Sequence, residues 1–293
     1  MARAKRAAAS LRGPLGESQQ ELTKRAGRTL RALLRAYPDA HVPLNFTTPL
    51  ELLIGTILAA QCTDKKVNEI TATLFRKYRT AADWAKAPVP ELEQEVRPTG
   101  FYRSKARSIH ESADDLVRLH GGQVPDTIEE LTALRGVGRK TANVVLSYAF
   151  GRPAIIVDTH FIRLTRRMGL TGEFEPEKIE ADLGRIVPEK DWSALSLAIT
   201  WHGRVTCFAR KPACAACVAR DDCPAAESGG VVTWRVKEPR RPAMTARARR
   251  DRAAKGLPAA RPRGRRAPKR KGPLRQAPRP PSRSSEDDVT PLH

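Results

Sequence analysis

Apolar residues recur at the three- and four-residue spacing of amphipathic helices along most of the chain, and few segments alternate with the two-residue period of a strand. One such helical face carries Leu53, Ile54, Ile57 and Leu58. With 293 residues, 40% of them apolar, the chain could hold one large or two modest domains. The pattern predicts an all-α fold.

Two of these helical patterns meet at a pair of glycines, Gly136 and Gly138. Thr127 and Glu130 have the spacing of a capping box at the start of the first helix. The apolar positions on either side are Leu131, Leu134, Ala142, Val144, Val145 and Leu146. The unit therefore reads as a helix-hairpin-helix motif.

The hairpin has the composition of a grip for phosphate. Glycines permit backbone torsions and close approach that a side chain would block, and the start of the second helix carries a partial positive charge. We therefore expect Gly136, Val137, Gly138 and Arg139 to contact a nucleic acid backbone, with the amine of Lys140 directly beside it. The alternative is a simple turn between packed helices, with Lys140 as a solvated surface residue.

Asp158 follows the apolar run 154–157 and precedes a new helical pattern at Phe161, Ile162 and Leu164. This position predicts a helix N-cap, which is a sufficient structural role for an aspartate.

Four cysteines lie within seventeen residues in the pattern C-x6-C-x2-C-x5-C, and they require a shared partner. The chain has no secretory signal, which argues against disulfides. Zinc sites usually present two close cysteine pairs, whereas only one pair is close here, so the unequal spacing favours a 4Fe-4S cluster over zinc. The expected ligands are Cys207, Cys214, Cys217 and Cys223.

The net charge of +21 is concentrated at the ends of the chain. Residues 1–30 carry +5, residues 235–283 carry +17 and the last ten residues carry −3, so that residues 31–234 hold only +2. The segment after Pro239 is rich in Arg, Pro and Ala and lacks aromatic residues, which predicts a disordered polycation that binds DNA in a salt-dependent way. A solubilising extension without a selected role is the alternative.

At this point the residues resemble endonuclease III, the iron-sulfur DNA glycosylase and abasic-site lyase family of the helix-hairpin-helix superfamily. The resemblance runs from about Leu44 to Cys223. Its motifs are 44–49, 60–64, 134–146, 157–160, the segment Trp201-His202-Gly203-Arg204, and the four cysteines.

The resemblance implies two helical lobes with DNA between them. Its boundaries here would be a basic arm at 1–17, a cluster lobe from 18–41 plus 153–230, a six-helix barrel with the hairpin at 42–152, and a basic tail at 231–293. The function implied is excision of oxidised pyrimidines and β-elimination at abasic sites in base excision repair. The expected partner is damaged double-stranded DNA, bound by a monomer.

The resemblance also implies roles for individual residues. Lys140 matches the nucleophile that forms a Schiff base with the sugar, and Asp158 the carboxylate that stabilises positive charge at C1′. Gln61 matches a side chain that fills the gap left by a flipped nucleotide, and Phe101 stands where a second such wedge, commonly leucine, is found. Arg210 and Lys211, inside the first cysteine loop, would present positive charge to the phosphates.

Two features depart from the family or leave alternatives open. Arg135 replaces a proline common before the glycines, and could add a phosphate contact at some cost in rigidity. A mismatch adenine glycosylase shares the cysteine spacing but generally lacks Lys140. A monofunctional glycosylase and a non-catalytic iron-sulfur DNA-binding or redox-sensing protein also remain as hypotheses.

The expected location is the bacterial cytoplasm, at the nucleoid. The N-terminal residues, poor in acids and rich in Arg and Ala, also suit an organelle transit peptide or a DNA-binding arm. No run of some twenty apolar residues exists, so membrane insertion is not expected.

Overall fold

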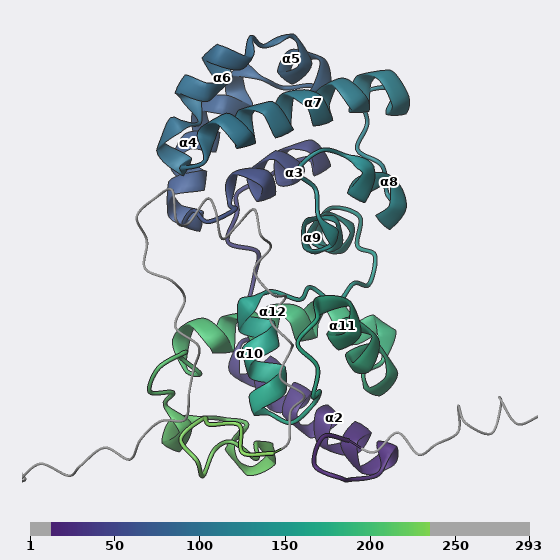
Figure 1. Cartoon of the computed structure of the whole chain (residues 1–293), viewed down its shortest axis with the longest axis vertical. Coiled ribbons are helices and arrows are strands. Elements are labelled where there is room, and N and C mark those ends of the chain that lie inside the picture. Colours follow the sequence, from purple (N-terminus) through teal and green to yellow (C-terminus); the bar gives the residue numbers. More distant parts are fainter. Residues whose placement is uncertain (1–12, 235–293) are drawn as a thin grey trace, which may run out of the picture. The chain divides into compact units, whose positions relative to one another are not determined.

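A computed structural model describes residues 13–234, and every regular element in that range is a helix (Figure 1). The all-α prediction is therefore confirmed for this part of the chain. The run 154–157 is buried but irregular, and it links the two groups of helices described below. Residues 1–12 and 235–293, which include most of the predicted arm and tail, lie outside the described residues.

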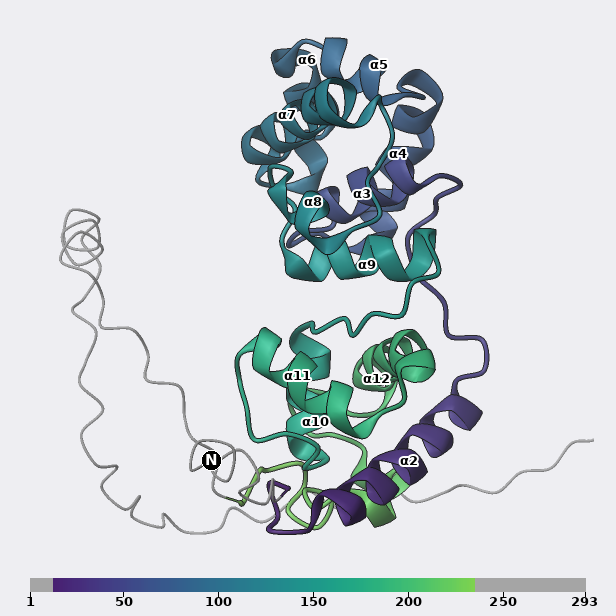
Figure 2. The ribbon, with the colours of Figure 1, turned by 90° about the vertical axis from the view of Figure 1, so that its right-hand side faces the viewer.

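The first lobe is formed by consecutive helices from one stretch of chain (Figure 2). They are α3 (Pro49–Leu58), α4 (Asp64–Lys77), α5 (Ala81–Lys86), α6 (Val89–Glu95), the 3-10 helix η1 (Arg97–Thr99), α7 (Tyr102–His120), α8 (Ile128–Ala133) and α9 (Arg139–Ala149). Residues 42–152, all described, hold seven α-helices, and the six-helix barrel at 42–152 stays a prediction. Pro88 separates α5 from α6, because the residue before a proline avoids helical torsions, and Ala87 ends α5 in an extended conformation.

The core of this lobe surrounds α3, which packs against α4, α7 and α9. Thr48 caps α3 by accepting a hydrogen bond from the amide of Glu51, and Pro49 occupies the first helical position. Leu52, Leu53 and Ile54 are fully buried. Consecutive residues of a helix point in different directions, so three consecutive buried residues mean that neighbouring helices surround α3 on several sides.

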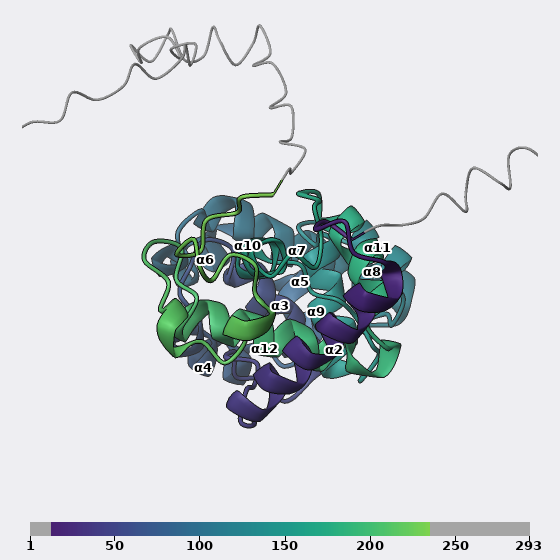
Figure 3. The ribbon, with the colours of Figure 1, turned by 90° about the horizontal axis from the view of Figure 1, so that it is seen from below.

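The second lobe combines an N-terminal helix with the C-terminal half of the fold. Its members are α2 (Gln19–Ala36), α10 (Thr159–Arg167), α11 (Pro176–Ile186), η2 (Glu189–Asp191), α12 (Trp192–Val205), η3 (Cys214–Ala216) and η4 (Arg220–Asp222). Figure 3 shows α2 beside α12, and the two helices are in contact. Leu33, Phe161, Leu183 and Ile199 are fully buried in a hydrophobic cluster separate from that of the first lobe.

The segment before α2 is also attached to this lobe. Glu17 pairs with the buried Arg25 of α2, whose guanidinium also donates to the backbone carbonyl of Gly169 at 2.7 Å. The predicted arm, 1–17, therefore includes residues that the fold uses. The sequence could not reveal this, because the pairing depends on a carbonyl 144 positions from Arg25.

Candidate active site and cysteine cavity

The two glycines of the hairpin between α8 and α9 have different structural roles. Gly136 has φ +77, and a Cβ there would lie 2.7 Å from the Cβ of Ser108 on α7. Gly138 is the N-cap of α9 with an ordinary φ of −90, and a Cβ there would meet nothing within 4 Å. Gly136 thus permits packing inside the protein, whereas Gly138 leaves open space in front of the amides that begin α9. Val137, between them, is buried, so only its backbone faces outward.

Lys140 and Asp158, one from each lobe, line the same pocket. Lys140 is the second residue of α9 and is exposed, and Asp158 caps α10. The cap is made by Asp158 Oδ1, which accepts a hydrogen bond of 2.7 Å from the amide of Phe161. The hydroxyl of Thr200, which also lines the pocket, lies 3.4 Å from Oδ2. The pocket encloses about 570 Å³.

Other polar groups in this pocket were not given site roles from the sequence. Arg204 of α12 pairs with Asp64 of α4 at 2.9 Å, which joins the two lobes across the pocket. Tyr148 of α9 lies here as well, and its burial, with the charge of Asp158, raises the pKa of its hydroxyl, so the phenol stays neutral. Both Asp64 and Arg204 lie in motifs that carry the family resemblance, 60–64 and 201–204, so the resemblance was the signal that could have identified them.

The two expected gap-filling residues share an unusual backbone conformation. Gln61 has φ +54 and Phe101 has φ +49, and Phe101 exposes 65% of its surface. Within residues 13–234 the only other non-glycine residue with positive φ is Lys211, at +53. Left-handed backbone costs energy for residues with a Cβ and is concentrated at functional sites. All three are residues for which the sequence predicted DNA contact.

The arginines near the hairpin are engaged with carboxylates. Arg139 forms two hydrogen bonds, of 2.8 and 2.9 Å, with Glu180 of α11, and this pairing raises the pKa of its guanidinium. Arg135, the departure from the family, pairs with Glu111 at 2.9 Å. Arg210 is exposed. Because Arg139 already pairs with Glu180 of the second lobe, it would have to give up this pairing to contact DNA.

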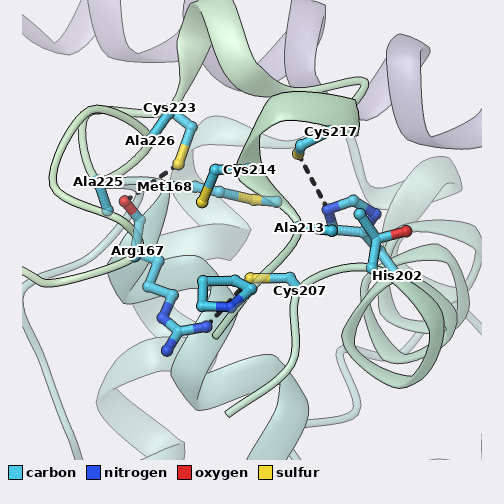
Figure 4. A pocket seen from close by; sticks show the side chains of 13 residues that line it. Arg167, Met168, His202, Cys207, Ala213, Cys214, Cys217, Cys223, Ala225 and Ala226 are labelled. Atoms are coloured by element: carbon cyan, nitrogen blue, oxygen red, sulfur yellow. Dashed lines mark hydrogen bonds between the residues drawn. The ribbon is translucent and has the colours of Figure 1, made fainter. Parts of the chain in front are cut away.

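The four clustered cysteines line one cavity of about 350 Å³ (Figure 4). All four are free and half-buried. Within residues 13–234 no group of three or more Cys, His, Asp or Glu side chains that could hold a metal ion is found, although the four thiols line the same cavity. Burial raises the pKa of Cys223 to about 11.

Polar groups of α10 and α12 contact three of these thiols, and the third contact runs from Cys223 Sγ to the carbonyl of Arg167 at 3.5 Å. Nε2 of His202 lies 3.3 Å from Cys217 Sγ, and its Nδ1 lies 2.7 Å from the hydroxyl of Tyr37. Burial lowers the pKa of His202 to about 4, so the ring is neutral near pH 7. Arg167 donates to Cys207 Sγ at 3.3 Å. Cys62, by contrast, packs against the core of the first lobe.

Comparison with known proteins decides the family. Residues 54–189 match the model of the HhH-GPD superfamily of base excision DNA repair proteins. Endonuclease III of Synechocystis is 45% identical over 206 residues, which is 70% of this chain and 94% of that protein. Endonuclease III of Escherichia coli K12 is 41% identical over 64% of this chain and 88% of its own length.

The chain belongs to the endonuclease III family.

Solved structures of this family share the fold. A non-covalent complex of an endonuclease III with DNA aligns with a TM-score of 0.68 at 41% identity, covering 70% of this chain and 97% of that one. An endonuclease III trapped as a covalent intermediate with DNA aligns equally well, with the same values. A thermostable thymine-DNA glycosylase, at 26% identity, gives 0.63. As an endonuclease III family member the chain is an enzyme of base excision repair with the helix-hairpin-helix fold. Among the helices of residues 13–234, none has the length and apolar content needed to cross a bilayer.

Proposed function

We propose that this chain is a bifunctional DNA glycosylase and abasic-site lyase that removes oxidised pyrimidines, with Lys140 as nucleophile and Asp158 as its carboxylate partner. The observation that carries the proposal is the presence of both side chains in one pocket at the junction of the lobes. The monofunctional and non-catalytic alternatives offer no reason for an amine and a carboxylate to face one cavity beside an open hairpin.

The chemistry follows from these groups. As the bond between C1′ and the base breaks, positive charge develops on the sugar, and the carboxylate of Asp158 stabilises it. Nζ of Lys140 forms a new bond to C1′ and gives up a proton, and the sugar ring opens to a Schiff base. Loss of a proton from C2′ then breaks the C3′–O bond, and water releases the lysine. The amine must be neutral to attack.

We further propose that Cys207, Cys214, Cys217 and Cys223 hold a 4Fe-4S cluster. Four free thiols around a cavity suit the ligand set of such a cluster better than that of a single zinc ion, whose ligands converge at about 2.3 Å. When bound, the cluster would cross-link the loop after α12 and would leave no open ligand position. Its role would therefore be structural, and it would keep Arg210 and Lys211 on a loop that we propose faces the DNA.

The substrate would be damaged double-stranded DNA, gripped at Gly136, Val137 and Gly138 through their amides. Gln61 and Phe101 would enter the gap when the damaged nucleotide is flipped out, which offsets part of the lost stacking. The relatives named above are bacterial, which supports action at the nucleoid. We propose that the protein acts as a monomer.

Borohydride trapping on a duplex with one thymine glycol tests the mechanism. We expect a covalent complex with the natural chain, none with Lys140→Gln, and much slower formation with Asp158→Asn. The control is Lys77→Gln, which removes an exposed lysine paired with Glu91 and Glu95 in the first lobe. Base release without trapping would establish the monofunctional alternative, and tight binding without either reaction the non-catalytic one.

A further inference from the structure

One face of α7 carries polar residues where a buried apolar stripe is normal. Lys105, Ser108 and Ser112 are spaced by three and four residues, and they are 4%, 7% and 0% exposed. Lysine is among the residues least often buried, so its place on this face needs a specific cause.

The cause is a pair of carbonyls from two other elements. Nζ of Lys105 donates to the carbonyl oxygens of Leu58 and Thr99, each at 2.8 Å. Leu58 is the last residue of α3 and Thr99 the last of η1. The final carbonyls of a helix lack partners within it and carry partial negative charge, so a buried ammonium is well matched to both. Burial lowers the pKa of Lys105.

The two carbonyls stand directly before the two loops that would enter the DNA. Gln61 follows Leu58 by three residues, and Phe101 follows Thr99 by two. The backbone amide of Lys105 also bonds the carbonyl of Phe101, at 3.1 Å. The left-handed torsions of Gln61 and Phe101 persist only if the surrounding structure enforces them, and Lys105 holds the chain three residues before Gln61 and two residues before Phe101.

We propose that Lys105 is a positioning residue that holds Gln61 and Phe101 at a fixed separation, so that both enter the gap of a flipped nucleotide together. This inference rests on the proposed function. It assigns Lys105 to the flipping step and not to the chemistry at C1′, because its ammonium donates to Leu58 and Thr99, and neither they nor Lys105 line the pocket of Lys140 and Asp158.

The same face of α7 supports the hairpin through different contacts. Ser112 donates to the carbonyl of Arg135 at 2.7 Å, and Ser108 lies against Gly136. These contacts hold the hairpin whose amides, at Gly136, Val137 and Gly138, we propose to bind phosphate. Ser112→Ala should therefore weaken binding to damaged and undamaged duplex alike, whereas a change at Lys105 should affect only steps that require an extruded base.

The test is a double-mutant cycle between Lys105→Met and the pair Gln61→Ala/Phe101→Ala. Methionine keeps the length of the side chain and removes the ammonium. Single-turnover release of thymine glycol from duplex DNA should fall by roughly tenfold to a hundredfold with Lys105→Met, as expected for lost positioning. In the Gln61→Ala/Phe101→Ala background the same change should cost less than about twofold, because the loops then carry nothing to position.

Two further measurements separate positioning from folding. Fluorescence of 2-aminopurine beside the lesion, which reports unstacking, should lose most of its binding-induced rise with Lys105→Met and keep it with the control Lys77→Met. Borohydride trapping on a preformed abasic site without an opposite base should stay within about twofold of the natural chain, because no stacked base need be extruded there. If Lys105→Met does not fold, Lys105→Gln, which retains donor hydrogens, carries the same cycle.

The outcomes distinguish this inference from the proposed function. Equal losses in both backgrounds would mean that Lys105 only stabilises the fold, and would overturn the inference. If the natural chain forms no trapped complex at all, the proposed function fails first. Trapping by the natural chain together with a non-additive cycle supports both.

Discussion

Gly136 and Gly138, two residues apart, should respond oppositely to one added methyl group. Gly136→Ala places a Cβ 2.7 Å from Ser108 at φ +77, so it should lower the free energy of unfolding by about 2 kcal/mol or more. Gly138→Ala meets open space at an ordinary φ, so stability should fall by no more than about 1 kcal/mol, because alanine is a poorer N-cap than glycine. Its methyl would instead stand where phosphate approaches.

Thermal unfolding and DNA titration of the two glycine variants together check this division. Gly138→Ala should bind duplex DNA more weakly while melting normally. Normal DNA affinity in that variant would show that the open space before α9 is not the phosphate grip.

Asp158 combines a cap with a proposed catalytic charge, and two substitutions separate them. Asparagine caps helices as well as aspartate, so Asp158→Asn should leave stability within about 0.5 kcal/mol, whereas Asp158→Ala should lose about 1 kcal/mol. Both should slow base release by roughly a hundredfold or more, since each removes the stabilising charge. Denaturant unfolding and single-turnover kinetics measure the two effects. Full activity in Asp158→Asn would show that Asp158 caps α10 but is not required for catalysis.

At the scale of elements, the pairing of α9 with α11 through Arg139 and Glu180 sets up a competition with DNA. Both side chains are partly exposed, so Glu180→Gln should change stability by less than about 1 kcal/mol. It frees Arg139, and DNA binding should tighten. Arg139→Gln should weaken binding and reduce the slope of log affinity against log salt by about 0.9, the value of one phosphate contact.

Salt-dependent titrations of these variants decide the role of Arg139. Arg118→Gln is the matched control, because Arg118 also pairs with a carboxylate, that of Asp115, at the far end of α7. An unchanged slope with Arg139→Gln would leave Arg139 as a tie between the lobes and remove it from the DNA interface.

At the scale of the whole molecule, the positive charge is concentrated outside residues 31–234. Residues 31–234 hold +2 and residues 235–283 hold +17. Replacing the nineteen Lys and Arg of 235–283 by Gln in the full chain should weaken non-specific binding and flatten its salt dependence. The excision rate at saturating enzyme should stay within about twofold, since Lys140 and Asp158 are untouched. A tail of the same composition in scrambled order is the control and should retain the affinity. If the glutamine tail binds equally well, the solubilising alternative holds.

The sequence by itself determined the helical class, the hairpin, the cysteine set and the family. These depend on short-range patterns: periodicity, the cap at Asp158, the two glycines and the spacing of four thiols. The six-helix barrel came only from the resemblance, and it stays a prediction.

Only the tertiary structure decided which distant polar groups meet. Asp64 and Arg204, Arg139 and Glu180, and Lys105 with Leu58 and Thr99 are brought together by packing of helices far apart in the chain. A charged residue in an amphipathic pattern is expected to face solvent, since periodicity reports burial of apolar groups and carries no information about a carbonyl elsewhere. The pocket of Lys140 and Asp158 exists for the same reason, because its walls come from both lobes and each lobe alone supplies only one of the two groups.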